Sequence, residues 1–184
     1  KVIHEEKLNS SVNCITWSPW EYGLILAAGT AEGRIFIFTR NSQDGKWSSF
    51  SFMAHEEGVN GLSWGPSTDP AMLTSKNNAS GEKKFSLPPK RLASGGNDHK
   101  VLVWEFKSDG EQKPTKTEVG GHDDWVRDVS WCGSMGLAYD MIASVSEDKT
   151  CKVWKLDSKT SKVSWSEKKI SFEPKVPLWK VSWS

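Results

Sequence analysis

Three copies of one sequence pattern follow each other along the 184 residues of the chain. The third copy reads GHDDWVRDVSW and then MIASVSEDKTCKVW, and it ends at Trp154. The second copy reads AHEEGVNGLSW and then RLASGGNDHKVLVW up to Trp104, and a weaker first copy ends at Phe38. In each copy a histidine precedes an alternating segment that ends in tryptophan. Such short alternating segments, repeated at a period of about 50 residues, predict a repeated β-sheet unit.

A histidine, an alternating strand and an acidic turn before a final aromatic residue are typical of the blades of a WD-type β-propeller. The sequence therefore predicts an all-β fold, a partial WD40 β-propeller with about three blades and the start of a fourth. The expected repeats cover residues 4–54, 55–121 and 122–170, and the next one starts within 171–184. Propellers close with about four to eight blades, so the chain is expected to be an excerpt of a larger ring.

The second copy is longer than the others because of residues 66–90, which are rich in Pro, Ser, Lys and Asn and show no periodicity. This composition predicts a surface loop between the first two strands of that blade. Its lysines, Lys76, Lys83, Lys84 and Lys90, are interpreted as solvated rather than as a partner contact. The other strands expected from alternation cover residues 47–53, 116–119, 142–146, 151–154 and 163–166.

The polar residues of the repeat have an expected structural role. In WD propellers a His, a Ser or Thr, an Asp and a Trp form a buried hydrogen-bonded relay that holds the turns of a blade. The two expected relays consist of His55, Ser94, Asp98 and Trp104 in the second copy, and of His122, Ser144, Asp148 and Trp154 in the third. The first copy has His4, Ala28, Glu32 and Phe38, so its relay is broken. We expect apolar packing to hold that blade together.

Composition argues against several classes of function. The chain has 24 basic and 23 acidic residues, so no charge pattern for direct binding to nucleic acid or an anionic membrane stands out. Its longest apolar run, residues 23–29, is too short to span a bilayer. The cysteines, Cys14, Cys132 and Cys151, have no metal-site spacing, and an odd, unpatterned count suits buried thiols in a reducing compartment.

Catalytic and cofactor hypotheses are weak. Residues 61–65 match the GxSxG pattern of hydrolases, but that motif needs a strand–turn–helix context and here it ends a repeat strand. Gly95-Gly96 precedes no helix that could bind phosphate, and His99 is expected to be exposed in a turn. We therefore expect no enzyme activity, cofactor or metal. Trp125 and Arg127 remain a possible surface contact, because peptide-reading WD adaptors present aromatic and charged residues in a central pocket.

Beyond the generic repeat, the chain resembles one family in detail. The strings are WEYGLILAAGTAEGRI, NGLSWGP with its insertion before KRLASGGNDHKVLVW, HDDWVRDVSW with SMGL, and LWKVSWS. Together they are similar to the Sec-thirteen family, the WD propeller of the COPII outer coat. The resemblance implies a six-bladed open ring completed by a blade from an α-solenoid partner of the Sec-thirty-one type. It places this chain at blades three to five and the first strand of blade six.

The resemblance further implies a non-catalytic scaffold in transport from the endoplasmic reticulum to the Golgi. It implies a peripheral location on the cytoplasmic face of the endoplasmic reticulum and on COPII vesicles. A second role in the nuclear pore, with a related solenoid nucleoporin, is part of the same expectation. The family's partner-binding residues fall on blades mostly absent here. The alternatives are a peptide-reading adaptor and the sister propeller of the nuclear pore and the lysosomal nutrient-sensing coat.

Overall fold

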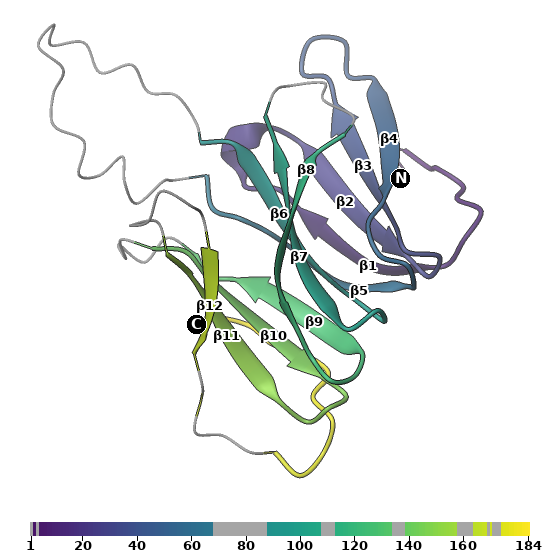
Figure 1. Cartoon of the computed structure of the whole chain (residues 1–184). Helices are drawn as coiled ribbons and strands as arrows, with labels where there is room; N and C mark the ends of the chain where they lie inside the picture. The colour runs from purple at the N-terminus through teal and green to yellow at the C-terminus, as the bar shows by residue number, and fades with distance from the viewer. Residues whose placement is uncertain are drawn as a thin grey trace, which may run out of the picture.

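Three four-stranded antiparallel sheets follow each other along the chain (Figure 1). The computed structural model describes residues 2, 4–67, 88–107, 113–133, 139–157, 164–168, 170 and 174–184. The first sheet consists of β1 (Val12–Trp17), β2 (Ile25–Thr30), β3 (Arg34–Arg40) and β4 (Trp47–Met53), with the short 3-10 helix η1 (Trp20–Tyr22) after β1. The second consists of β5 (Val59–Trp64), β6 (Lys90–Gly96), β7 (Lys100–Phe106) and β8 (Thr115–Gly121). The third consists of β9 (Val126–Trp131), β10 (Met141–Ser146), β11 (Cys151–Asp157) and β12 (Ser164–Lys168).

The prediction of a partial all-β propeller is confirmed, because each repeat forms one sheet whose strands pair in chain order. Several details differ from the prediction. Lys90 begins β6 instead of ending the loop, because it pairs with Phe106 of β7. Residues 68–87 of the expected insertion lie outside the described residues. The expected first strand of a fourth blade, near Trp183, is not a paired strand, because residues 181–183 contact β9 through the side chains of Asp128 and Trp183 and not through a backbone ladder.

The hairpin between the second and third strands of each blade requires a residue in the left-handed backbone region. Gly33 has a φ of 86° there, whereas His99 and Lys149 occupy the corresponding turns with a φ of 67°. A side chain at Gly33 would meet the backbone oxygen of His55 at 2.2 Å, so that turn needs glycine. Non-glycine residues in this region carry a modest backbone strain. His99 is half-buried, in contrast to the expected exposure.

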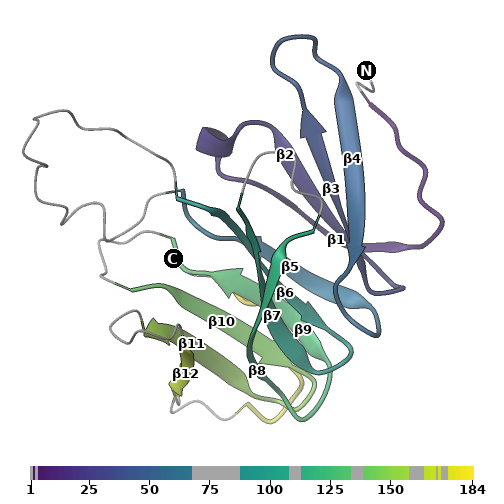
Figure 2. The ribbon, with the colours of Figure 1, turned by 45° about the horizontal axis from the view of Figure 1, so that its top comes forward.

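The sheets pack face to face, and the space between each pair is an apolar core. Between the first two sheets, Ile25, Ile37 and Phe52 meet Trp104 and Phe106. A second core fills the space between the second and third sheets. The first strands of the blades, β1, β5 and β9, contact one another in turn, and Figure 2 shows them beside each other with β4 farther out. The stacking leaves the outer face of the first sheet without a neighbouring sheet among the described residues.

Candidate functional site

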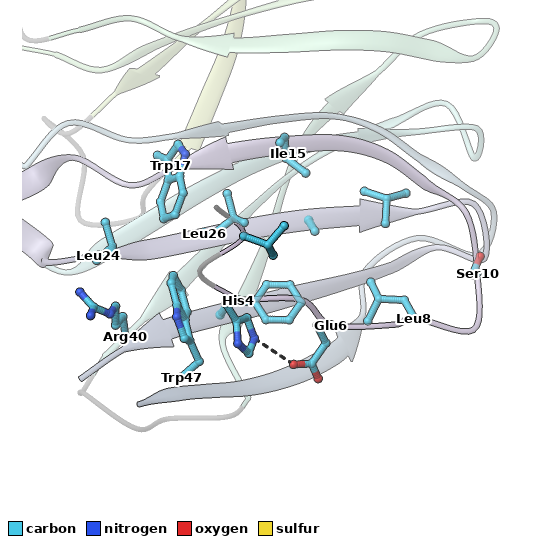
Figure 3. Close-up of a pocket in the computed structure, with 14 residues that line it drawn as sticks. His4, Glu6, Leu8, Ser10, Ile15, Trp17, Leu24, Leu26, Arg40 and Trp47 are labelled. Atoms are coloured by element: carbon cyan, nitrogen blue, oxygen red, sulfur yellow. Dashed lines mark hydrogen bonds and ion pairs between the residues drawn. The ribbon is translucent and has the colours of Figure 1, made fainter. Parts of the chain in front are cut away.

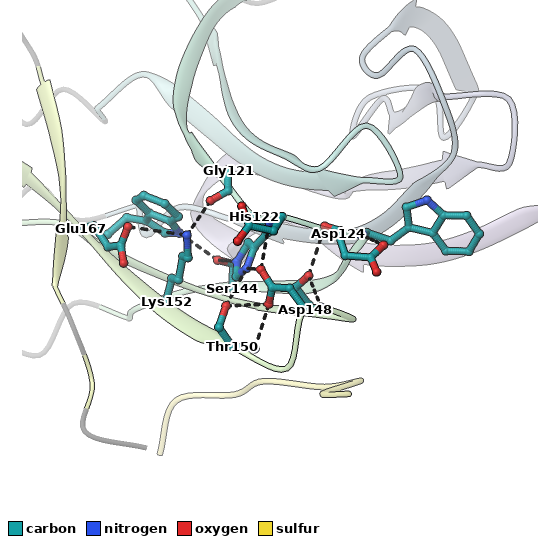
Figure 4. A network of polar contacts seen from close by, with 12 residues as sticks. Gly121, His122, Asp124, Ser144, Asp148, Thr150, Lys152 and Glu167 are labelled. Carbon is teal, nitrogen blue, oxygen red and sulfur yellow. Dashed lines mark hydrogen bonds and ion pairs between the residues drawn. The ribbon is translucent and has the colours of Figure 1, made fainter. Parts of the chain in front are cut away.

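The relay of the third blade is a continuous hydrogen-bonded chain (Figure 4). Trp154 Nε1 donates to Ser144 Oγ at 2.8 Å, and the same oxygen lies 2.8 Å from His122 Nε2. His122 Nδ1 lies 2.9 Å from Asp148 Oδ2. Asp148 also accepts from the backbone N–H of Thr150 at 2.8 Å and from its hydroxyl at 2.6 Å. The relay thus joins the turn before β9 to strands β10 and β11.

The second blade repeats this arrangement. Trp104 Nε1 donates to Ser94 Oγ at 2.9 Å, and His55 Nε2 lies 2.8 Å from that oxygen. His55 Nδ1 lies 2.6 Å from Asp98 Oδ1. Both histidine side chains are fully buried. The structure therefore brings together all eight residues that the sequence assigned to relays, four in each of two blades.

Hydrogen-bond chemistry gives the relay of the third blade a direction. An indole N–H can only donate and an ionised carboxylate can only accept. Ser144 therefore accepts from Trp154 and donates to His122, whose Nδ1–H donates to Asp148. The imidazole must be neutral for this chain to be complete, because a proton on Nε2 would leave the serine hydroxyl without its acceptor.

The electrostatics of this relay agree with a neutral imidazole. Burial lowers the pKa of His122 below its ordinary value, although the Asp148 carboxylate acts in the opposite direction. Burial alone would raise the pKa of Asp148, but hydrogen bonds from Thr150 and Asp123 and the nearby His122 outweigh it and lower the pKa to about 2. For Asp98, likewise, burial acts to raise the pKa, but the hydrogen bond and charge of His55 and the backbone N–H groups of Lys100 and Glu56 together outweigh it and lower the pKa. These groups stabilise the fold and present no reactive centre to solvent.

The first blade has no relay. His4 stacks on Trp47 with ring centroids 5.2 Å apart and bonds to Glu6, so it lies at the edge of the sheet. Ala28 and Phe38 are buried, and Glu32 is exposed. The buried residues of this blade are largely apolar, with Ile25, Ala27, Ile35 and Ile37 in the core shared with the second blade.

The outer face of the first sheet forms an open apolar groove of about 790 Å³ (Figure 3). Its floor includes Leu26 and Phe38, and alternate residues of segment 2–10 line its rim. Ile15 is 63% exposed and Trp17 is 52% exposed, whereas the residues at the same strand positions of the second blade, Leu62 and Trp64, are 8% and 7% exposed. Sequence reasoning missed this groove. The sequence contained a signal for it, because the apolar positions of the first copy match those of the second copy, whose face is covered by a neighbouring sheet.

Trp125 and Arg127, the possible surface contact, lie together. The Arg127 guanidinium is 5.0 Å from the Trp125 ring and 4.5 Å from the Trp179 ring, and Arg127 Nε donates to Glu147 at 2.7 Å. Trp125 is 41% exposed and Trp179 is 61% exposed. The cation is thus already paired and stacked on two rings. It holds residues 178–180 against β9 and has little capacity left for a peptide ligand.

The GxSxG pattern has a structural explanation. Ser63 Oγ accepts a hydrogen bond from the backbone N–H of Trp131 at 2.9 Å, which ties β5 to β9. A side chain at Gly61 would lie 2.7 Å from the backbone nitrogen of Val129, so glycine permits the close approach of these strands. Neither residue lies at a strand-to-helix turn.

Other kinds of site receive no support within the described part of the chain. It contains no cluster of three or more His, Cys, Asp or Glu residues that could hold a metal ion. In the same residues no helix has the length and apolarity needed to cross a membrane. The three cysteines are free thiols, and burial raises the pKa of each, that of Cys14 to about 12. Such thiols are poor nucleophiles.

Comparison with known proteins agrees with the repeat pattern. Residues 112–155 match the family model described as "WD domain, G-beta repeat". The whole chain is 34% identical to "Protein transport protein sec13" of Aspergillus fumigatus, of which it covers 56%. It is 35% identical to the protein of the same name from Emericella nidulans, again with 56% covered. It is also 39% identical over 96% of its length to "Protein transport protein SEC13-2" of Candida glabrata. The chain thus spans little more than half the length of these relatives.

Proposed function

Because the chain belongs to the Sec-thirteen family of WD-repeat proteins, we propose that it is part of a non-catalytic scaffold subunit in protein transport. The setting is the COPII outer coat of vesicles that leave the endoplasmic reticulum for the Golgi. The observation that carries the proposal is the similarity of the whole chain to relatives whose names are those of protein transport proteins.

The polar contacts of the blades support a scaffold role. Two of the histidines, His55 and His122, are bound to Asp98 and Asp148 in buried relays, and the serine of the GxSxG pattern bonds to a neighbouring strand. The stacked sheets share continuous apolar cores. Such a body suits a task that depends on rigidity and on shape rather than on chemistry.

Two observations support a ring that continues on both sides of these three sheets. The apolar groove on the first sheet has the composition of a face that another sheet covers. At the other side, Trp183 Nε1 donates to the backbone oxygen of Ser130 at 2.9 Å, just as Trp64 Nε1 donates to that of Thr16 at 3.2 Å. Residues 178–184 therefore lie where the inner strand of a next blade belongs. A longer, open ring of six blades accommodates both features.

An open ring needs a partner for its unpaired sheet edges, and a strand set donated by that partner removes this liability through main-chain hydrogen bonds. The proposed partner is an α-solenoid coat protein of the Sec-thirty-one type, with a related nucleoporin as a second one. The proposed location is the cytoplasmic face of the endoplasmic reticulum, with contact to the membrane only through the coat. The balanced charge of the chain suits an apolar seam.

Purification of the full-length protein from its own cells at high salt tests the proposal. A permanent interface of roughly 2,000 Å² or more should survive that treatment, so a solenoid coat subunit should co-elute. Depletion of the protein should also delay the export of a secreted reporter from the endoplasmic reticulum. Recovery of a chromatin or ligase complex alone, with normal export, would favour the peptide-reading adaptor. Recovery of lysosomal coat subunits alone would favour the sister propeller.

A further inference from the structure

Strand β4, the outer edge of the first sheet, contains no charged residue. Its sequence is WSSFSFM, whereas β8 carries Lys116 and Glu118, and β12 carries Glu167 and Lys168. Charged residues on an edge strand normally keep it from pairing with another chain. From this contrast we infer that β4 is a homotypic docking edge, at which the first sheet pairs with β4 of a second copy of the chain.

The backbone of β4 is suited to pairing. All seven residues, Trp47 to Met53, pair with β3 in continuous register, with no bulge. By contrast, the register between β7 and β8 shifts at Val101 and Leu102. A bulge twists an edge strand and hinders the addition of another strand. On the side opposite β3, no strand of the described residues pairs with β4, which leaves a regular row of backbone groups.

The sequence of β4 indicates that the strand added at this edge is β4 of a second copy, because most of its positions are complementary to themselves in an antiparallel pair. In an antiparallel pair centred on Phe50, that residue faces its own copy, and Ser49 faces Ser51. Farther from the centre, Ser48 faces Phe52 and Trp47 faces Met53. At the Phe50, Ser49/Ser51 and Trp47/Met53 positions, apolar side chains thus meet apolar ones and hydroxyl groups meet each other, whereas Ser48 is placed opposite Phe52. Cross-strand pairs of this kind stabilise a sheet, and no charge is placed opposite a like charge.

The side chains at this edge are already held in place. The Phe52 ring is tilted against that of Trp104, with the centroids 4.9 Å apart, and Phe50 meets Phe106 edge-on at 6.4 Å. Met53 is 55% exposed and Ser49 is exposed, so pairing would cover surface that now faces solvent. One added strand gives a small contact in the transient class, below roughly 1,200 Å². The expected dimer is therefore weak, depends on concentration, and does not require the proposed transport role.

Sedimentation equilibrium of the full chain up to about 1 mM tests the inference. All samples carry Ile15→Lys, which places a charge in the apolar groove and blocks association through that face. Ser49→Lys with Ser51→Lys puts lysines opposite lysines, and this double variant should weaken the dimer about tenfold. Ser49→Glu with Ser51→Glu should have the same effect. An equimolar mixture of the two double variants should restore the dimer, because unlike charges then face each other.

Thr115→Lys with Thr117→Lys on β8 is the matched control, since it adds the same charges to another outer strand and should leave the dimer unchanged. Restoration in the mixture also shows that both charged variants fold. The inference is overturned if the parent sample stays monomeric over the whole range. It is equally overturned if the variants of β4 associate as the parent does, or if the mixture stays monomeric while each variant shows the native fluorescence of its tryptophans.

Discussion

At the scale of single residues, one hydroxyl group determines whether each relay is complete. Ser94 and Ser144 are fully buried, and each connects an indole that can only donate to an imidazole that must accept. Without that hydroxyl, both neighbours lose a partner in a region that water does not reach. Leaving a buried polar group without a partner is more costly than the net gain of a typical hydrogen bond. The serine is thus the most sensitive position of the relay.

Ser144→Ala should lower the free energy of unfolding by about 1–3 kcal/mol, because Trp154 Nε1 and His122 Nε2 are left unsatisfied. Urea denaturation followed by tryptophan fluorescence measures this change. Ser48→Ala on the exposed surface of β4 is the control and should change stability by less than about 0.5 kcal/mol. Equal effects of the two substitutions would show that the relay contributes nothing beyond a surface serine.

Acid should weaken the fold through the relay of the third blade. The pKa of His122 is lowered in the folded protein, so below its ordinary value of about 6.5 the unfolded chain binds more protons than the folded one. Stability is therefore complete above about pH 6.5 and falls as the pH decreases. The pKa of Asp148, lowered to about 2, extends the loss between about pH 4 and pH 2.

His122→Gln removes the titrating group, so the difference in unfolding free energy between pH 7 and pH 5 should be smaller than in the unmodified chain. Urea denaturation at the two pH values measures it. A difference that is unchanged in His122→Gln would place the acid sensitivity elsewhere.

At the scale of elements, the inner strands act as the joint between blades. Asn13 and Asn60 donate side-chain hydrogen bonds to the backbone oxygens of Val59 and Val126, which begin the next inner strands. At the third junction, Arg127 stacks against Trp179 instead. Side chains of one inner strand thus bond to the backbone of the next at two of the junctions. These bonds require neighbouring inner strands to lie close together.

Gly61→Ala should separate β5 from β9, because the added methyl group would lie 2.7 Å from Val129 N and 2.8 Å from Asp128 Cα, both backbone atoms. Overpacking of this kind costs roughly 1–3 kcal/mol of stability, measured by thermal or urea unfolding. Gly133→Ala is the control, since nothing lies within 4 Å of the added carbon. If Gly61→Ala is as stable as Gly133→Ala, the two strands are not held at this distance in solution.

At the scale of the whole molecule, the two faces of the stack differ. The groove on the first sheet exposes a large apolar surface, whereas residues 174–184 cover part of the third sheet with contacts to Asp128 and Ser130. Contiguous apolar surface of this kind marks an interaction site. We therefore expect the groove to be the surface of this chain that binds apolar molecules most readily.

A hydrophobic fluorescent dye should bind the chain at this groove. Ile15→Lys with Trp17→Lys should reduce the fluorescence increase by about half or more, since two exposed apolar side chains that line the groove are replaced by charged ones. Ile170→Lys, at an exposed apolar residue outside the groove, is the control and should bind dye as the unmodified chain does. Undiminished dye binding by the double variant would place the apolar surface elsewhere.

The sequence by itself determined the register of the repeat. The alternation of residues 126–131 and the spacing from His122 to Trp154 were sufficient to predict both relays and most strands, because hydrogen-bonding groups at fixed intervals permit few arrangements. Strand ends were less accurate, as at Lys90, because the end of a strand depends on its partner. The alternation pattern contains no such information.

Only the tertiary structure decided which faces are covered. Ile15 and Leu62 occupy the same position in their repeats, yet one is exposed and the other is buried, because burial depends on which sheet lies opposite. In the same way, Arg127 was a possible ligand contact until the positions of Glu147 and Trp179 showed its charge to be paired and stacked. Local sequence specifies a blade, whereas the contacts between blades determine which of its apolar side chains stay exposed and which of its charges stay unpaired.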